Sequence, residues 1–503
     1  MIRSVIALLL GGLLVLTGCG NRSARDDKSA QPGPHARPTA EALRSILAKN
    51  ASFELASYPV GFWNYLTISD PNHRSTMTEQ EVENWHEAGF TLVQGPRVNA
   101  NNPGEVELMT DMLDWAHERG MKMILWDSRF WDEANDGLGA TLDDFGDHPA
   151  LFGLHIVDEP IGDRRHHFFA QAKRVKEGAP HLHPFVNLGP HHPGNEEYIG
   201  VESYVQYLDE AAVEGNLDFL CYDNYMQMNP GKEGWYSYFA NLRLVREAGW
   251  RHGIPFWTTV LSAGHYRYRR PNYDDLRWQF NTAVASGAAG IQYFFYYMRD
   301  PHRNYVNPPV DGFWEKTQTY YDLRKVHCTF HRRYGDLFVK LTATRVTFTG
   351  GQAYGGGEVF TPNEVLTEVR MLHDGTEGLV GEFVDAEGRR YVMVVNNSTT
   401  TPAYVILTFA GGEDVKIYNY GWDGVERQGP AHCVEVQGRR DGALKVGYWL
   451  APGEELVQRV DSELIRNSEI SVAMRELRQG DAQLAGPGEP DADEAQLAPA
   501  AEN

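Results

Sequence analysis

Two adjacent carboxylates, Asp158 and Glu159, stand at the end of an apolar, β-prone run at residues 151–160 (LFGLHIVDEP). The run has no turn residue after Gly153, which is typical of a strand buried on both faces of a parallel sheet. Because Pro160 cannot donate to a strand ladder, we expect the strand to end there and the acids to emerge into a loop. A carboxyl in such a place can act as a general acid if its pKa rises toward neutral pH.

This run is the fourth of eight similar apolar runs, which begin 30 to 38 residues apart and alternate with amphipathic segments. Such spacing fits a repeated unit of strand, loop and helix. The first connecting segment begins with a capping box at Thr78 and Glu81 and closes at Gly89. Eight units predict a (β/α)8 TIM barrel over residues 41–337. The alternative is a doubly wound open sheet, but no glycine-rich phosphate loop follows the first run.

The pattern changes after Tyr334. Residues 338–461 alternate with period two between Gly and Asn turns, which predicts an antiparallel β-sandwich. Residues 462–503 are acidic and rich in Gly, Ala and Pro. We expect a short helix near residues 463–477 and a largely disordered tail after it.

The carboxyl ends of the strands of a β/α barrel meet at one face, so polar residues that follow the runs are candidate site residues. The candidate catalytic residues are Glu159, Asp158 and Asp223. The candidate substrate-binding residues are Trp63, Asn64, Arg97, Asp127, Arg129, Trp131, Asn187, Asn224, Tyr225, His265, Gln292 and Tyr296. Tyr65, Asn99, His191, His192, Ser262, Tyr293, Arg299 and Asp300 lie near the same ends. Acids and amides bond hydroxyl groups and aromatic rings stack on C–H faces, a combination suited to polyols.

Other ligand classes are disfavoured. Histidines cluster around the fifth run, but there is no His-Glu-x-x-His motif, so we interpret them as loop residues or hydroxyl donors and expect no metal or cofactor. No glycine-rich nest for phosphate occurs at the strand ends. The net charge of −22 argues against nucleic acid, whose affinity depends mainly on Lys and Arg.

The N-terminus indicates export. Arg3 precedes an apolar run at residues 5–16 that is too short to span a bilayer. The run ends in Leu-Thr-Gly-Cys, which resembles the bacterial lipoprotein signal. The resemblance implies that residues 1–19 form a signal ending at a lipidated Cys19. The polar, proline-containing composition that follows predicts a flexible tether over residues 20–40. Because Gly20 follows, and not the Asp of an inner-membrane retention signal, we expect a lipid anchor in the outer membrane.

The eight-unit barrel, the phrase HPALFGLHIVDEP and the trailing sandwich resemble a retaining-glycosidase barrel of the large clan that includes the β-galactosidases and cellulases. That clan carries an Asn-Glu-Pro-type acid/base at the end of strand four, so the resemblance implies this role for Glu159. Two features depart from it. Asp158 replaces the clan's Asn, and the seventh run, residues 256–265 (FWTTVLSAGH), has no carboxylate to act as the nucleophile.

Three mechanisms therefore stay open. Asp223 or Asp127 could be the second carboxylate, with a separation from Glu159 of about 5 Å for retention or about 6.5–9.5 Å for inversion. The Asp158-Glu159 pair also resembles the Asp-Glu pair of the substrate-assisted N-acetylhexosaminidases, where Tyr225 would bond the acetamido carbonyl. Neighbouring strand residues point to opposite sides, however, so the pair would diverge unless the strand bends. The third possibility is a non-catalytic glycan-binding lipoprotein. The expected function is hydrolysis of an extracytoplasmic oligo- or polysaccharide, with Glu159 as general acid/base.

Overall fold

The computed structural model describes residues 36–99, 102–299, 304–373, 375–429, 435–440 and 443–484. Within these residues the eight apolar runs form eight parallel strands in the order β1-β8-β7-β6-β5-β4-β3-β2, so the predicted barrel is confirmed. The strands are β1 (Val60–Phe62), β2 (Leu92–Gln94), β3 (Lys122–Leu125), β4 (Leu151–Asp158), β5 (Phe185–Leu188), β6 (Leu220–Asp223), β7 (Phe256–Leu261) and β8 (Gly290–Phe294).

The barrel closes between β1 and β2 through Thr91, which directly precedes β2. The backbone N–H of Thr91 donates to the carbonyl of Val60 at 2.9 Å, and its hydroxyl accepts from the Val60 N–H at 2.9 Å. The same hydroxyl donates to the carbonyl of Tyr58. These bonds complete a nearly closed ring, so the carboxyl ends of the eight strands face one side of the barrel.

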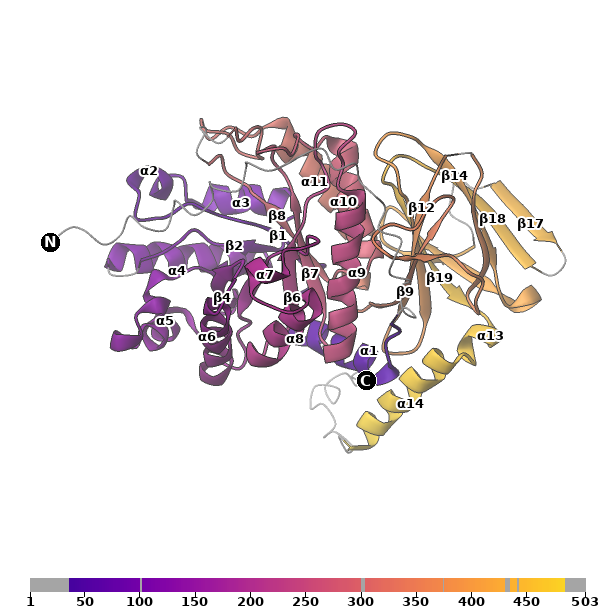
Figure 1. The fold of residues 1–503 in the computed structure, drawn as a ribbon, viewed down its shortest axis with the longest axis horizontal. Helices are drawn as coiled ribbons and strands as arrows, with labels where there is room; N and C mark the ends of the chain where they lie inside the picture. Colours follow the sequence, from indigo (N-terminus) through magenta and orange to yellow (C-terminus); the bar gives the residue numbers. More distant parts are fainter. Residues whose placement is uncertain are drawn as a thin grey trace, which may run out of the picture. The chain divides into compact units, whose positions relative to one another are not determined.

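Helices surround the barrel strands and bury their apolar faces against them (Figure 1). In the described part of the chain, helix α1 (Ala40–Ser52) precedes β1. The helices and short helical turns that follow the strands are α2 (Pro71–Arg74), α3 (Glu79–Glu87), α4 (Pro103–Glu118), η1 (Ser128–Trp131), η2 (Glu133–Asn135), α5 (Gly137–Phe145), α6 (Arg164–Gly178), α7 (Glu196–Ile199), α8 (Tyr204–Glu214), α9 (Trp235–His252), α10 (Tyr273–Ala285), α11 (Gln318–Phe330), η4 (His331–Gly335) and α12 (Asp336–Phe338).

Strand β4 is the longest of the barrel strands and requires glycine near its start. A Cβ on Gly153 would lie 1.7 Å from the carbonyl oxygen of His183, just before β5, so no other residue fits at this approach. Both neighbours of β4 pair with a register shift, on the β5 side between His155 and Val157. The strand ends at Asp158, directly before the bend that carries Glu159.

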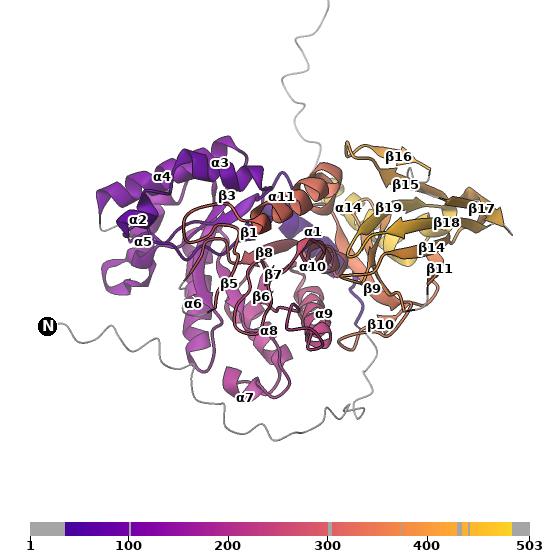
Figure 2. The same ribbon diagram turned by 90° about the horizontal axis from the view of Figure 1, so that it is seen from above.

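The C-terminal region is a β-sandwich, as predicted (Figure 2). One sheet has the order β10-β9-β12-β13-β19-β15-β16 and the other the order β11-β14-β18-β17; every pairing is antiparallel except β10 with β9. The strands are β9 (Thr342–Thr349), β10 (Glu358–Val359), β11 (Leu366–Met371), β12 (Gly378–Val384), β13 (Arg390–Asn396), β14 (Ala403–Phe409), β15 (Lys416–Tyr420), β16 (Glu426–Gln428), β17 (Glu435–Arg440), β18 (Ala443–Leu450) and β19 (Glu455–Asp461), with η5 (Gly412–Asp414) between β14 and β15.

Helix α10 connects the barrel to the sandwich, because it contacts β12 and β13 as well as β7 and β8. The indole N–H of Trp278 donates to the side-chain oxygen of Asn397 at 2.9 Å, and the Asn281 amide donates to Glu455 at 2.7 Å. Apolar residues of the large sandwich sheet, including Phe383, belong to the same buried cluster as the barrel core. The sandwich therefore shares its core with the barrel wall.

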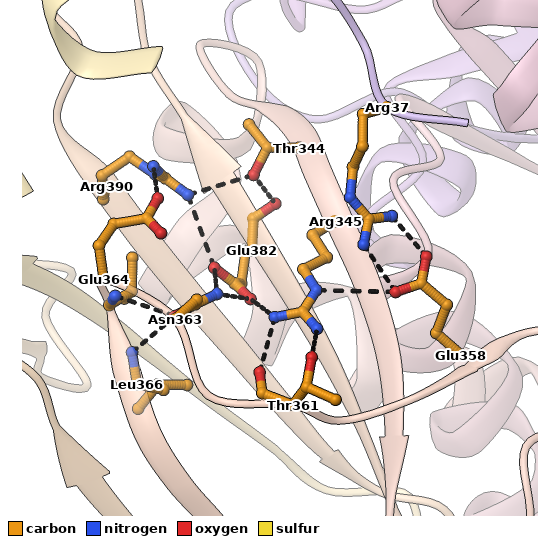
Figure 3. A network of polar contacts seen from close by, with 11 residues as sticks. Arg37, Thr344, Arg345, Glu358, Thr361, Asn363, Glu364, Leu366, Glu382 and Arg390 are labelled. Atoms are coloured by element: carbon orange, nitrogen blue, oxygen red, sulfur yellow. Dashed lines mark hydrogen bonds and ion pairs between the residues drawn. The ribbon is translucent and has the colours of Figure 1, made fainter. Parts of the chain in front are cut away.

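A polar network crosses the large sandwich sheet and reaches the start of the described chain (Figure 3). Arg37 donates to Glu358 at 2.6 Å, and Glu358 also faces Arg345. Deeper in the sheet, Glu382 is fully buried and accepts from Asn363 at 2.7 and 2.8 Å. The buried guanidinium of Arg390 lies 3.5 Å from Glu382 and donates to Glu364 at 3.0 Å, so each buried charge has a partner of opposite sign.

Between the sandwich and residue 484, where the described chain ends, lie helices α13 (Glu463–Arg466) and α14 (Glu469–Leu484). Helix α14 lies beside α1 (Figure 1), and Met474 packs with Leu43, Leu47 and Val384 in a small buried cluster. Helical structure thus continues beyond residue 477. No helix within the described residues is long and apolar enough to span a membrane.

Candidate active site

A cavity of about 390 Å³ opens at the carboxyl ends of the barrel strands. It is lined by Trp63, Tyr65, Asp158, Glu159, Asn187, Pro190, His192, Asp223, Asn224, Tyr225, His265, Tyr266, Tyr268, Phe294, Arg299 and Tyr305. Three carboxylic acids, two amides and a wall of aromatic rings thus meet in one space. This is the polar and aromatic mixture that the strand ends predicted for polyol recognition.

The backbone at Glu159 explains how two neighbouring acids reach the same cavity. Glu159 has φ 45°, in the left-handed region that non-glycine residues rarely adopt. Its N–H donates to the carbonyl of Asn187 at 2.8 Å, and the carbonyl of Pro160 accepts from the Tyr207 hydroxyl at 2.8 Å. These bonds fix the chain as it leaves β4. The alternation of an extended strand is therefore broken, and Asp158 and Glu159 do not diverge.

Asn187 joins two of the three acids. Its amide nitrogen donates to Asp158 at 3.0 Å and to Asp223 at 3.1 Å. Its amide oxygen accepts from the hydroxyl of Thr259 at 3.3 Å and faces the thiol of Cys221 at 3.8 Å. Because the donors around the oxygen fix the orientation of the amide, both of its N–H groups point at carboxylates.

Glu159 and Asp223 are in direct hydrogen-bond contact with each other. The negative charge of Asp223, followed by burial and by the charge of Asp158, raises the pKa of Glu159 far above its ordinary range. Burial raises the pKa of Asp223 as well, but hydrogen bonds from Tyr225, Asn187 and Glu159 oppose that rise. The proton shared by this pair therefore resides on Glu159 near neutral pH, while Asp223 carries the charge.

The pKa of Asp158 lies near neutral pH. Burial and the charge of Asp223 raise its pKa to about 7, while the Asn187 hydrogen bond and the charge of Arg299 act in the opposite direction. Solvent still reaches both Asp158 and Glu159 through the mouth of the cavity. The three acids together can thus hold one proton firmly and exchange a second near neutral pH.

Aromatic rings form the wall of the cavity. Tyr225 stacks on Phe294 with ring centroids 5.6 Å apart, and Trp63 stacks on Tyr65 at 5.8 Å. The guanidinium of Arg299 lies 3.6 Å from the centroid of the Tyr65 ring. Burial lowers the pKa of His265 to about 4, so its imidazole is neutral at physiological pH.

The cavity brings together eight of the predicted residues: Trp63, Asp158, Glu159, Asn187, Asp223, Asn224, Tyr225 and His265. Seven others do not line it, namely Asn64, Arg97, Asp127, Arg129, Trp131, Gln292 and Tyr296. Of the residues noted beside the same strand ends, Tyr65, His192 and Arg299 line it, whereas Asn99, His191, Ser262 and Tyr293 do not. Asp300 lies outside the described residues. Sequence reasoning missed Pro190, Tyr266, Tyr268, Phe294 and Tyr305.

Internal contacts account for three of the residues outside the cavity. Asp127 accepts from the Arg129 side chain at 2.7 and 2.9 Å and from the Thr141 hydroxyl at 2.9 Å. Arg129 also donates to Asp144, so the two carboxylates neutralise its charge within the loop after β3. Tyr296 is fully buried and stacks on Phe62 at 4.3 Å. After β7 the sequence places aromatic rings at His265, Tyr266 and Tyr268. This cluster of rings is the signal that could have added Tyr266 and Tyr268 to the predicted set.

A second cavity, of about 370 Å³, lies at the amino ends of the strands. Its central charge, Asp218, is buried and accepts from Lys49 at 2.6 Å, Lys176 at 2.7 Å and His183 at 2.7 Å. These bonds lower the pKa of Asp218. The charge of Asp218 is therefore fully matched by these donors inside the fold. In the described part of the chain, no group of three or more His, Cys, Asp or Glu could hold a metal ion.

Comparison with known proteins gives similarity of structure only. No protein-family model matches the chain, and no curated protein sequence does. Similar solved structures include a family 39 glycoside hydrolase from Bacteroides cellulosilyticus WH2 (11% identity, 85% of this chain and 83% of that chain, TM-score 0.44) and a β-galactosidase from Rahnella sp. R3 (10%, 82% and 100%, TM-score 0.46). A β-galactosidase from the psychrophilic Marinomonas ef1 is similar over 54% of this chain and 59% of its own, less than two thirds of its length (12% identity, TM-score 0.41). Identities this low assign neither a substrate nor catalytic residues.

Proposed function

We propose that this protein is a glycoside hydrolase in which Glu159 is the general acid/base and Asp223 the second carboxylate. The observation that carries the proposal is the contact between these two carboxyl groups within a cavity walled by aromatic rings. A pair of carboxylic acids, one protonated and one ionised, is what cleavage of a glycosidic bond requires.

The charge distribution supports the division of roles. Glu159 keeps its proton near neutral pH because Asp223 repels a second negative charge. Asp223 accepts hydrogen bonds from Tyr225 and Asn187, which favour its ionised form. Glu159 would thus protonate the leaving oxygen while Asp223 attacks or stabilises the anomeric carbon. A hydrogen bond between the two carboxyl groups requires a separation shorter than the roughly 6.5–9.5 Å of inverting enzymes, which favours retention of configuration.

Substrate assistance is the second candidate, because Asp158 faces the same cavity as Glu159. In that mechanism Asp158 would orient the 2-acetamido group of the substrate, whose oxygen would attack the anomeric carbon in place of an enzymic nucleophile. Tyr225 lines the same space, and its single O–H, which Asp223 accepts in the free protein, would turn to the acetamido oxygen. Asp223 would then act only through its charge on Glu159.

A screen of aryl glycosides with and without a 2-acetamido group separates the two mechanisms. Three results together would support Asp223 as the nucleophile. The wild-type protein hydrolyses glycosides without the acetamido group, NMR shows that the product first released keeps the anomeric configuration, and Asp223→Asn loses turnover. Activity confined to 2-acetamido sugars supports assistance by Asp158. Binding of glycans without hydrolysis by the wild-type protein would overturn both mechanisms and leave a glycan-binding protein.

We also propose that Cys19, which lies outside the described residues, anchors the protein by a lipid to the cell envelope. The proposal rests on the Leu-Thr-Gly-Cys sequence after a short apolar run. Metabolic labelling with a fatty acid in a diderm bacterial host should label the wild-type protein and not Cys19→Ala. Labelling of both proteins, or of neither, would contradict the anchor, and fractionation of the labelled protein tests the outer-membrane location.

A further inference from the structure

One cavity residue, Arg299, carries a charge that the acids of the site do not neutralise. Among the lining residues Arg299 is the one with a permanent positive charge, because the pKa values of His192 and His265 are lowered by burial. Within the described residues, no carboxylate lies within ion-pair distance of Arg299 and no acceptor bonds its guanidinium. Arg129, by comparison, is bound by Asp127 and Asp144.

Stacking fixes the orientation of this guanidinium. Its central carbon lies 3.6 Å from the ring centroid of Tyr65 and 5.6 Å from that of Tyr305. A guanidinium stacked on a ring keeps its five N–H donors at its edges, where they remain free for an acceptor in the same plane. The planar fork matches a carboxylate or a sulfate, which can accept two N–H bonds at once.

Neutralising the acids of the site does not explain why Arg299 lies in the cavity. Asp158 is the acid on which the charge of Arg299 acts, yet burial, Asp223 and Asn187 each influence Asp158 more strongly than Arg299 does. Glu159 and Asp223 are held instead by each other, Asn187 and Tyr225. The positive charge of Arg299 therefore lies beside the reacting groups, but none of these acids forms an ion pair with it.

We propose that Arg299 binds an anionic substituent of the sugar, so that the substrates are glycosides of an acidic sugar, either a uronic acid or a sulfated one. The inference rests on the proposed function for the identity of the ligand as a sugar. The anionic group would lie in the plane of the guanidinium above Tyr65, while the scissile bond lies at Glu159 and Asp223. An uncharged sugar would leave the guanidinium without a counter-charge.

The test compares matched pairs of methylumbelliferyl glycosides, each pair consisting of a hexuronide or a 6-sulfated hexoside and its neutral hexoside. Wild-type protein should prefer the acidic member, and Arg299→Met should lower kcat/KM on it by about 10- to 100-fold, the equivalent of one charged hydrogen bond. Activity on the neutral member should fall by a smaller factor than activity on the acidic member, so the ratio of the two kcat/KM values is the quantity compared. Arg299→Lys should restore only part of the loss, because an ammonium lacks the planar fork.

Arg164→Met is the matched control, since Arg164 also stacks on an aromatic ring, Phe168 at 5.4 Å, but lies outside the cavity. This variant should keep the wild-type preference. Loss of preference on uronides alone identifies a carboxylate as the anion, and loss on sulfated sugars alone identifies a sulfate. Equal losses on neutral and acidic members in Arg299→Met, or a wild-type preference for neutral sugars, would overturn the inference and leave the glycosidase standing.

Calorimetric titration of the free acidic and neutral sugars provides a readout that does not depend on turnover. Arg299-dependent binding of the acidic sugar in a protein that hydrolyses no glycoside would support the inference at the level of binding and refute the proposed activity. Binding of both sugars with equal affinity to wild type and Arg299→Met would refute the inference itself.

Discussion

Replacing Asn187 with leucine should alter the pH dependence of activity more than it alters the fold. Leucine has a similar volume but removes both N–H donors, which bond Asp158 at 3.0 Å and Asp223 at 3.1 Å. Hydrogen bonds to charged groups are worth about 1.5–3 kcal/mol each. Because these bonds stabilise the ionised acids, their loss raises the pKa of both carboxyl groups.

The direction on each limb of the pH profile follows from the charges. The acid that must be ionised stays protonated up to a higher pH, so the acid limb of kcat/KM should move up by about 1 to 2 pH units for one lost bond. At the alkaline limb Asp223 is ionised in both proteins, so its charge acts on Glu159 as before. The alkaline limb should therefore stay in place, and the bell should narrow from the acid side alone.

The assay is kcat/KM of the full chain on its best aryl glycoside over the pH range in which the protein stays folded. Asn281→Leu is the matched control, because Asn281 is a buried asparagine that donates to a carboxylate, Glu455, far from the cavity lining. It should lose stability but keep the wild-type limbs. A folded Asn187→Leu variant with an unchanged acid limb would refute the role assigned to this amide.

Two further predictions concern the acid and the sandwich. Glu159→Gln should lower kcat about 10²- to 10⁴-fold on glycosides with poor leaving groups and far less on dinitrophenyl glycosides, which need no proton; equal losses on both would contradict proton donation. Arg390→Leu should cost about 3 kcal/mol of unfolding free energy in denaturant titrations, because it leaves the buried Glu382 with fewer partners. Arg37→Ala removes a more exposed ion pair and should cost less than about 1 kcal/mol, so similar losses in the two variants would show that burial does not set the cost.

The barrel could be predicted because its strands are apolar on both faces and recur at a near-constant interval. Strand β4 is the clearest case, since burial of its residues 151–156 matches the apolar run in the sequence. The sandwich could be predicted for the complementary reason, that alternation with period two persists after Tyr334. Both patterns are local, and local patterns survive in the sequence.

The composition of the cavity depended on contacts that no local pattern records. Asp127 and Asp223 both follow barrel strands, but the first is occupied by Arg129 and Thr141 while the second meets Glu159. Tyr305 reaches the cavity from the loop after β8, and nothing in the spacing of that loop shows where it returns. Residues that follow a strand end directly were thus easier to place than residues of long loops.

The left-handed backbone of Glu159 implies a conflict between activity and thermal stability. An L-residue in this region is disfavoured by about 1–2 kcal/mol, a cost that glycine avoids. The same turn is what aims the carboxyl group at Asp223 and into the cavity. Variants selected only for thermal stability should therefore acquire glycine at this position and lose the proton donor. Selection for turnover should keep glutamate despite its backbone strain.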